Sequence, residues 1–233
     1  MKVLARGRTS KHIWNLDLPP IIFNNACPNC GGEIDSKRLA LGVPCKTCLN
    51  IRITEIRKAK KKLSRVGFLE YIDRRMNYEH GDRFKRIVEL EKEVEKINSL
   101  SKKISGNRLW SAQRTWAKRL VKGVSFSITA PTGLGKTYFG MMAAIYMALK
   151  GKRTLFIVPT VALVSHVMKR LREYIGRIKK DIIVIGYHAK MPIHEKREFR
   201  KRVGSKKFHI MVVTSRFLAR RFDMIRRIFY DFV

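Results

Sequence analysis

Short apolar runs alternate with amphipathic segments over the second half of the chain. The runs at 154–158, 182–186 and 209–213 are rich in β-branched residues and predict buried strands. Segments with helical periodicity lie beside them, at 138–150, 161–174, 192–204 and 216–227. Strands and helices that alternate in this way are typical of a parallel sheet covered by helices, so we predict an α/β fold.

Two further apolar segments extend this pattern at its ends. The run at 124–129 predicts a strand directly before a glycine-rich turn, and 229–233 predicts the opening of a fifth strand. The sequence stops within that last segment, on an apolar residue, which does not resemble a domain terminus. We therefore expect the parallel sheet in this chain to be incomplete.

The residues from 51 to 105 have a helical pattern instead. Apolar residues recur there at spacings of three, four or seven, at Ile87, Leu90, Val94, Ile97 and Ile104. The repeat is too short for a long coiled coil, so it predicts a helical arm packed on a neighbour. Gly106 and Asn107 then end the helix. The predicted divisions are a metal-binding module at 1–54, a helical connector at 55–105 and the α/β domain at 106–233.

The turn after the first apolar run has the sequence of a phosphate-binding loop. A strand, a glycine-rich turn and a helix follow one another there, as such a loop requires. Glycines let successive backbone N–H groups point at one anion, and the positive end of the helix dipole adds to the attraction. The alternative is an incidental glycine turn before a helix. The predicted nucleotide-binding residues are Ala130, Pro131, Thr132, Gly133, Leu134, Gly135, Lys136 and Thr137.

Two residues of this loop have specific predicted roles. Lys136 can reach the β- and γ-phosphates of ATP, and the hydroxyl of Thr137 can hold Mg²⁺. The general pattern begins with glycine, whereas this loop begins with Ala130. The sequence thus predicts ATP and Mg²⁺ as cofactors.

All four cysteines of the chain lie in one short segment. Cys27 and Cys30 form one Cys-x-x-Cys pair, and Cys45 and Cys48 form the second after an intervening stretch of 14 residues. Two such pairs can bring four thiolates to the corners of a tetrahedron, which predicts structural Zn²⁺ in a zinc-ribbon module. Two disulfides and an iron–sulfur cluster are the alternatives. The segment is too short for a core of its own, so a metal would hold it together.

The charge is strongly positive, with 51 Lys and Arg against 18 Asp and Glu, a net charge of +33. The basic residues are distributed over the whole chain, so nucleic acid is the predicted partner and an acidic membrane surface is the alternative. The basic run from Lys58 to Lys62 fits either a solvated helix face or a phosphate-facing one. The sequence has no apolar run long enough to span a bilayer and no signal peptide, so we expect a cytoplasmic protein.

Several short stretches, in this order, resemble superfamily 2 helicases. Gln113 lies upstream of the loop, where that family has a glutamine that reads adenine, and the loop resembles the family's first motif, which commonly begins with alanine. Pro159 and Thr160 resemble the next motif, and Thr214 the third. The resemblance implies that these last three residues contact the nucleic-acid backbone. By themselves they are equally typical of helix caps.

The cysteine pairs and the segment around Gln113 together resemble the amino-terminal end of the reverse gyrase family. That family joins a helicase-like module to a type IA topoisomerase and introduces positive supercoils into DNA at the expense of ATP. The resemblance covers nearly the whole chain but only about the first fifth of a typical member. It implies an incomplete RecA-like sheet of the P-loop NTPase type, preceded by a DNA-binding zinc module and a helical segment.

The parts that this resemblance leaves out bear on activity. The acidic Walker B residues that hold Mg²⁺ would follow Val233, and the second helicase lobe and the topoisomerase modules would be partners in the same or a separate chain. Asp223 and Asp231 do not stand where they could substitute. We therefore expect this chain to bind ATP and DNA without hydrolysing ATP alone. The alternatives are a non-catalytic zinc-containing DNA-binding module and part of another superfamily 2 DNA or RNA helicase.

Overall fold

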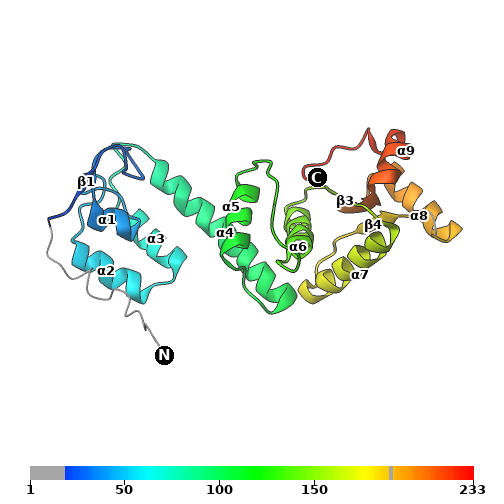
Figure 1. Cartoon of the computed structure of the whole chain (residues 1–233), viewed down its shortest axis with the longest axis horizontal. Helices are drawn as coiled ribbons and strands as arrows, with labels where there is room; N and C mark the ends of the chain where they lie inside the picture. The colour runs from blue at the N-terminus through cyan, green and yellow to red at the C-terminus, as the bar shows by residue number, and fades with distance from the viewer. Residues whose placement is uncertain (1–18, 189–190) are drawn as a thin grey trace, which may run out of the picture. The chain divides into compact units, whose positions relative to one another are not determined.

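The computed structural model describes residues 19–188 and 191–233. The first 18 residues of the predicted metal-binding module therefore lie outside the described residues. The chain divides into two compact units, Met1–Glu89 and Leu90–Val233, and each is described by itself. Figure 1 labels most of their helices and strands.

The first unit combines one short hairpin with short helices. Strands β1 (Ile22–Phe23) and β2 (Ile34–Asp35) pair antiparallel. The helices that follow are α1 (Ser36–Leu41), α2 (Ile53–Lys62), α3 (Arg65–Asp73) and α4 (Arg83–Ser105), which begins in the first unit and ends in the second. Their caps fit the sequence, since Asp35 accepts from the N–H of Arg38 at the start of α1 and Ser64 accepts from the N–H of Gly67 at the start of α3.

The core of the first unit is small and lies between α2, α3 and the first turns of α4. Its fully buried side chains include Ile56, Ile72 and Phe84. A second, smaller cluster contains the cysteines together with Ile34. A core of this size gives limited stability, so a bound metal would add substantially to it.

The second unit consists of helices around a parallel sheet. Its helices after α4 are α5 (Ser111–Val121), α6 (Lys136–Leu149), α7 (Val161–Ile178), α8 (Ile193–Gly204) and α9 (Ser215–Ile225). Its strands are β3 (Thr154–Val158), β4 (Val184–Tyr187) and β5 (Ile210–Thr214). The predicted alternation of strands and helices after 154 is thus confirmed, with boundaries shifted by a few residues.

The sheet has the order β3-β5-β4, and all of its pairs are parallel. β5 is central and fully buried, because successive side chains enter two different cores. Ile210 and Val212 pack into the cluster that contains α6 and α7, whereas Met211 and Val213 pack into the cluster that contains α8 and α9. The sheet is therefore a middle layer between two layers of helices, the arrangement expected of an α/β fold.

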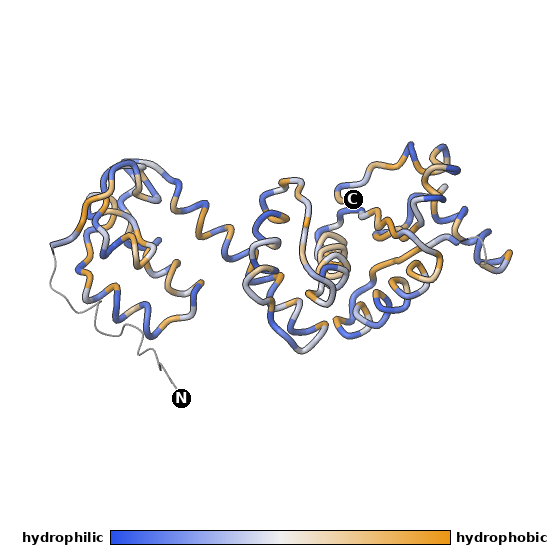
Figure 2. Tube along the Cα trace, viewed as in Figure 1, coloured by the Kyte–Doolittle hydropathy of each residue, from blue (hydrophilic) through white to orange (hydrophobic). Residues whose placement is uncertain are grey.

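Helix α6 is apolar around almost its whole circumference, and nine of its residues between Phe139 and Ala148 are buried. A helix without a polar face is stable only when other elements surround it. It packs against α5, α7, β3 and β5. By contrast, α7 is strongly amphipathic and alternates between hydrophobic and hydrophilic residues along its turns (Figure 2). Among the described residues, no helix is both long and apolar enough to cross a membrane.

One predicted strand is absent. The segment 124–129 has no strand assignment, although Phe126 and Ile128 pack against the core. The segment at 229–233 pairs only through a single parallel bridge between Phe232 and Thr154, and the N–H of Leu155 donates to the carbonyl of Phe232. A strand needs a hydrogen-bonded neighbour, and in the described chain the free edge of β3 is paired only at this first position. The prediction of a regular strand at 124–129 is therefore wrong for this structure.

The prediction for α4 is partly confirmed. Val94, Ile97 and Ile104 are fully buried in the second unit, as a packed helical arm requires. Ile87 is 37% exposed, and Phe84 and Val88 are instead buried in the first unit. The buried face of α4 therefore differs between its two ends, since each end packs into a different core. A single heptad pattern could not indicate this change.

Glu93 on α4 forms a polar cluster with α6 and the residue after it. Its carboxylate accepts from Tyr146 at 2.6 Å and from Lys150 at 2.7 Å, and Lys96 lies 2.5 Å away on its own helix. Hydrogen bonds from Lys150, Lys96 and Tyr146 lower the pKa of Glu93 to about 2. The charged form is therefore favoured by folding, and this contribution is present above the ordinary pKa of 4.5 and lost as pH falls toward 2.

We predict that Glu93→Gln lowers the free energy of unfolding by about 1–2 kcal/mol at pH 7, because the ion pairs with Lys96 and Lys150 lose the carboxylate charge and become weaker contacts to a neutral amide. The difference from the unchanged protein should shrink between pH 4.5 and pH 2. Chemical denaturation followed by circular dichroism measures both. The control Glu173→Gln breaks an exposed pair with Arg170 and should change stability little. A pH-independent effect of Glu93→Gln would contradict the electrostatic assignment.

Candidate functional site

The glycine loop between 130 and 137 has the backbone of an anion cradle. Gly133 and Gly135 have φ values of +83° and +75°, which side chains with a Cβ rarely adopt. Gly135 is also the N-cap of α6, so the helix begins at Lys136. The first N–H groups of α6 have no carbonyl partner within the helix and are available to an anion.

The side chain of Lys136 folds back over this loop. Its ammonium donates to the carbonyl of Ala130 at 2.6 Å and to the carbonyl of Pro131 at 2.8 Å. The charge is therefore held directly above the cradle, within reach of an anion that enters it. Thr137, the next residue, is exposed, and its hydroxyl is accessible to a bound cation or ligand.

Gln113 lies against the loop. It belongs to α5 and is 6% exposed, and a Cβ added to Gly135 would stand only 2.9 Å from its amide nitrogen. Any residue larger than glycine at 135 would have to displace this amide. From the sequence, only the resemblance to superfamily 2 helicases indicated that Gln113 and the loop belong to one site. The structure brings the two into contact.

Tyr138 anchors the start of α6, a role that sequence reasoning did not find. Its hydroxyl lies 2.8 Å from the hydroxyl of Ser101 and 2.9 Å from that of Ser105, both on α4. Its ring packs edge-on against Tyr174 of α7, with ring centroids 5.9 Å apart. The N-terminal end of α6, which would face a phosphate, is thus fixed by contacts with both α4 and α7. Nothing in the sequence around Tyr138 indicated this anchoring role.

A cavity of about 450 Å³ borders the loop. The segment from Val124 to Ile128 lines one side, Phe139 and Gly140 of α6 line another, and Phe232 and Val233 stand at its edge. Lys136 contributes to the same lining.

Thr160 and Thr214, the predicted backbone contacts, both serve as N-caps. The hydroxyl of Thr160 accepts from the N–H of Leu163 at the start of α7, and that of Thr214 accepts from the N–H of Phe217 at the start of α9. Thr214 pairs with Val158, two residues before Thr160, so both helices begin at the same edge of the sheet. Pro159 is exposed between β3 and this cap. Two neighbouring helix N-termini there can donate N–H groups to phosphates.

Neither aspartate near the C-terminus lies at this edge. Asp231 accepts from the N–H of Arg153, which precedes β3 at the opposite edge of the sheet. Asp223 is on α9, 87% exposed, and pairs with Arg226. Asp231 also belongs to the lining of a cavity to which Lys136 contributes.

The four cysteines converge on one point in the first unit. The sulfur atoms of Cys27, Cys30, Cys45 and Cys48 all lie within 4.8 Å of one another, and no two are joined in a disulfide. The sulfurs of Cys30 and Cys45 are 3.8 Å apart. Zn–S bonds of about 2.3 Å in a tetrahedron place neighbouring sulfurs roughly 3.8 Å apart, so the donor set fits Zn²⁺. The disulfide alternative does not match this geometry.

The thiols of this cluster differ in their pKa values. Burial raises the pKa of Cys48 to about 12. Burial also raises that of Cys27, but N–H donors from Cys45, Asn29 and Cys30 outweigh it and lower the pKa of Cys27 to about 7. A cation at the centre would favour the thiolate form of all four by direct coordination.

Two buried polar residues that sequence reasoning missed support the cluster. Asn29 is fully buried, donates to the sulfur of Cys48 at 3.4 Å and accepts from the N–H of Phe84 at the start of α4. Arg38 is 4% exposed, and its guanidinium donates to the carbonyls of Pro44, Leu49 and Ile51 at 2.7–3.0 Å. These bonds hold the chain on either side of the second cysteine pair. An asparagine inside a Cys-x-x-Cys pair was the only sequence signal for either residue.

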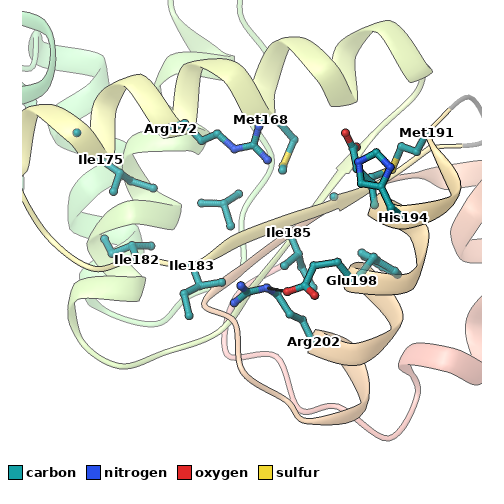
Figure 3. A pocket seen from close by; sticks show the side chains of 15 residues that line it. Met168, Arg172, Ile175, Ile182, Ile183, Ile185, Met191, His194, Glu198 and Arg202 are labelled. Atoms are coloured by element: carbon teal, nitrogen blue, oxygen red, sulfur yellow. Dashed lines mark hydrogen bonds and ion pairs between the residues drawn. The ribbon is translucent and has the colours of Figure 1, made fainter.

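Another cavity, of about 670 Å³, lies away from the loop, along the edge strand β4 between α7 and α8 (Figure 3). Met168, Ile185 and Phe199 form part of its apolar floor, and Arg202 pairs with Glu198 at its rim. None of the residues predicted to bind nucleotide or DNA lines it.

Comparisons with known proteins match both the segment that carries the loop and the segment that carries the cysteines. Residues 110–230 match the DEAD/DEAH box helicase family, and residues 20–64 match the reverse gyrase zinc finger. The chain is 39% identical over 224 residues to "Reverse gyrase" of Pyrococcus furiosus, covering 91% of this chain and 17% of that protein. "Reverse gyrase" of Pyrobaculum aerophilum is 37% identical over 227 residues, with 94% and 17% covered.

A bacterial relative has a similar match. "Reverse gyrase 1" of Aquifex aeolicus is 35% identical over 208 residues, covering 89% of this chain and 16% of that protein. The chain thus spans about a sixth of the length of these relatives. A solved structure, "Crystal Structure of DUF1998 helicase MrfA bound to DNA", matches 53% of this chain and 17% of that chain, with 25% sequence identity and a TM-score of 0.45. That partial likeness supports no functional inference.

We predict one zinc per chain by elemental analysis of the purified protein. Because the first unit has a small core, chelation of the metal or Cys48→Ser should unfold it while the second unit retains its helical signal. Limited proteolysis with mass spectrometry distinguishes the two units. The matched control Ser64→Ala, a helix cap away from the sulfurs, should keep its zinc. Iron, or no metal, in the purified protein would contradict the assignment.

Proposed function

We propose that this chain, which belongs to the DEAD/DEAH box helicase family and is the N-terminal region of a reverse gyrase, binds ATP and DNA. It would do so as part of an ATP-dependent type IA topoisomerase. That whole protein would introduce positive supercoils. The observation that carries the proposal is the ammonium of Lys136 held over a glycine cradle at the start of α6. The proposed divisions are 1–54 for the zinc module, 55–105 for the connector and 106–233 for the first helicase lobe.

The nucleotide would lie across the loop. Its phosphates would accept from the N–H groups at the start of α6 and from Lys136, which would exchange the carbonyls of Ala130 and Pro131 for phosphate oxygens. Gln113, in contact with Gly135, is in position to hydrogen-bond the base. The hydroxyl of Thr137 would hold Mg²⁺, which would supply positive charge to balance that of the phosphates.

Hydrolysis needs more than this chain supplies. A carboxylate must hold the metal and orient the attacking water, and a cation from a second lobe must stabilise the developing charge. Asp231 is hydrogen-bonded to Arg153 at the far edge of the sheet, and Asp223 is on the exposed face of α9. We infer that the isolated chain binds ATP without turning it over, and that the acidic residues come from the remainder of the helicase module.

DNA would contact both units. In the second unit the caps at Thr160 and Thr214 present two helix N-termini at one sheet edge. In the first unit Lys58, Lys61 and Lys62 of α2 are exposed, whereas Lys60 donates to the carbonyl of Leu41. Lys60 is thus engaged within the protein, whereas the other three lysines are exposed and can contact phosphates. We propose that this face of α2 binds the DNA backbone.

We predict that Lys136→Ala weakens binding of a fluorescent ADP by about tenfold or more, because charge-assisted bonds to phosphate are lost. Fluorescence titration of the whole chain measures this. The control Lys152→Ala removes an exposed lysine beyond the end of α6 and should leave the affinity unchanged. Equal affinity of Lys136→Ala and the unchanged protein would exclude the loop as the nucleotide site.

We predict that DNA affinity falls steeply as salt rises, since each phosphate contact on duplex DNA contributes about −0.9 to the slope of log K against log salt. The double variant Lys58→Ala, Lys62→Ala should reduce the steepness by roughly two units. Fluorescence anisotropy at salt concentrations from about 50 to about 200 mM measures the slopes.

The control for this comparison is Lys102→Ala, Lys103→Ala, which removes two exposed lysines from the end of α4. It should leave the slope nearly unchanged. An unaltered slope in the α2 variant would indicate that this face of α2 is exposed to solvent and does not contact DNA. A flat salt response of the unchanged protein would reject DNA as the partner.

A further inference from the structure

Arg114, directly after Gln113 on α5, bridges two carboxylates of α4. One of its terminal nitrogens lies 3.1 Å from the carboxylate of Glu91, and the other lies 3.2 Å from that of Glu95. The side chain of Glu91 is 3% exposed and also pairs with Lys118 at 2.5 Å. The fork of a guanidinium can hold two carboxylates with defined geometry, whereas a lysine ammonium acts as a single point charge. These pairs therefore fix α5 against α4 at the turn that carries Gln113.

Other contacts hold the same part of α5. The buried Asn98 of α4 accepts from the N–H of Leu109, two residues before α5, and donates to Glu95, both at 2.9 Å. Trp116 projects from the opposite side of the helix to Arg114, because two residues correspond to about 200° of rotation. Its ring packs edge-on against Phe139 of α6, with ring centroids 5.3 Å apart. α5 is thus held between α4 and α6.

The orientation of α5 decides where the amide of Gln113 points. Gln113 is 6% exposed and faces Gly135, and its amide forms no hydrogen bond with other residues of the described chain. Side chains reach about 5–6 Å from a helix axis, so a rotation of α5 by roughly 20° would move this amide by about 2 Å. A hydrogen bond to a ligand does not survive such a shift. The contacts that stop α5 from turning therefore control what Gln113 can bind.

An amide distinguishes purines best when its orientation is fixed. It offers a donor and an acceptor side by side, which match N7 and the N6 amino group of adenine. Guanine presents two acceptors, N7 and O6, at these positions, so the amide carbonyl would face O6 and repel it. An amide that is free to turn can present its NH₂ group to guanine instead. Loosening of α5 should therefore reduce the preference for adenine.

We propose that Arg114 is a positioning residue for nucleotide selectivity, which bridges Glu91 and Glu95 and thereby holds Gln113 in the orientation that favours adenine over guanine nucleotides. The proposal rests on the proposed nucleotide-binding function and adds the class of nucleotide that the site prefers. Arg114 contacts α4 and acts on the base only through Gln113.

The test is a double-mutant cycle on the whole chain, titrated with fluorescent ADP and fluorescent GDP that carry the label on the ribose. The unchanged protein should bind ADP at least about tenfold more tightly than GDP, and Gln113→Ala should reduce this ratio to about one. Arg114→Ala should lower the ratio by at least about threefold. It should not lower the ratio further in the Gln113→Ala background, because its effect passes through the amide.

Two further variants complete the experiment. Arg114→Lys serves if Arg114→Ala unfolds because Glu91 loses a partner. It keeps the charge but cannot bridge both carboxylates, so the protein should remain folded by circular dichroism while the ratio falls by about twofold. The matched control Arg202→Ala breaks an arginine–carboxylate pair with Glu198 on α8 and should keep the ratio of the unchanged protein.

Several outcomes would overturn the proposal. An unchanged ratio in the Arg114 variants, equal weakening of ADP and GDP, or a loss that persists in the Gln113→Ala background would leave Arg114 with a structural role only. Equal affinity of the unchanged protein for ADP and GDP would also overturn the proposal, and nucleotide binding would stand. Failure of the unchanged protein to bind fluorescent ADP would instead reject the proposed function itself.

Discussion

The second unit depends on the burial of α6, a helix with almost no polar surface. Nine of its residues are buried, and α5, α7, β3 and β5 all pack on it. The few polar atoms that it carries find partners on α4, where Tyr138 meets Ser101 and Ser105 and Tyr146 meets Glu93. Because the helix is held on all sides, its N-terminus is fixed, and the glycine loop before it inherits a defined position.

The first unit is held together in a different way. Its apolar core is small, and four sulfurs, one buried asparagine and one buried arginine connect its loops. Arg38 bonds three backbone carbonyls around the second cysteine pair, and Asn29 links Cys48 to the start of α4. These are directional contacts that fix loop geometry, and a metal at the sulfurs would connect them to the stability of the whole unit.

The incomplete sheet explains why one part of the fold differs from its sequence pattern. The run at 124–129 has the apolar residues of a strand, yet it has no hydrogen-bonded neighbour in the described chain, since β3 is paired on that side only at Thr154. Its side chains Phe126 and Ile128 still pack on the core, so burial follows the pattern even where backbone pairing does not. Apolar periodicity reports burial, whereas strand formation also requires a partner.

The sequence by itself determined the local features of this protein. Glycines at positions that need positive φ, cysteines in two short pairs and hydrophobic periods of two and 3.6 residues identified the loop, the metal ligands and most helices and strands, because each depends on residues close together in the chain. Only the tertiary structure brought Gln113 against Gly135 and set Asn29 beside Cys48. Those features depend on how distant segments pack, and packing is decided by the shapes and partners of all the elements together.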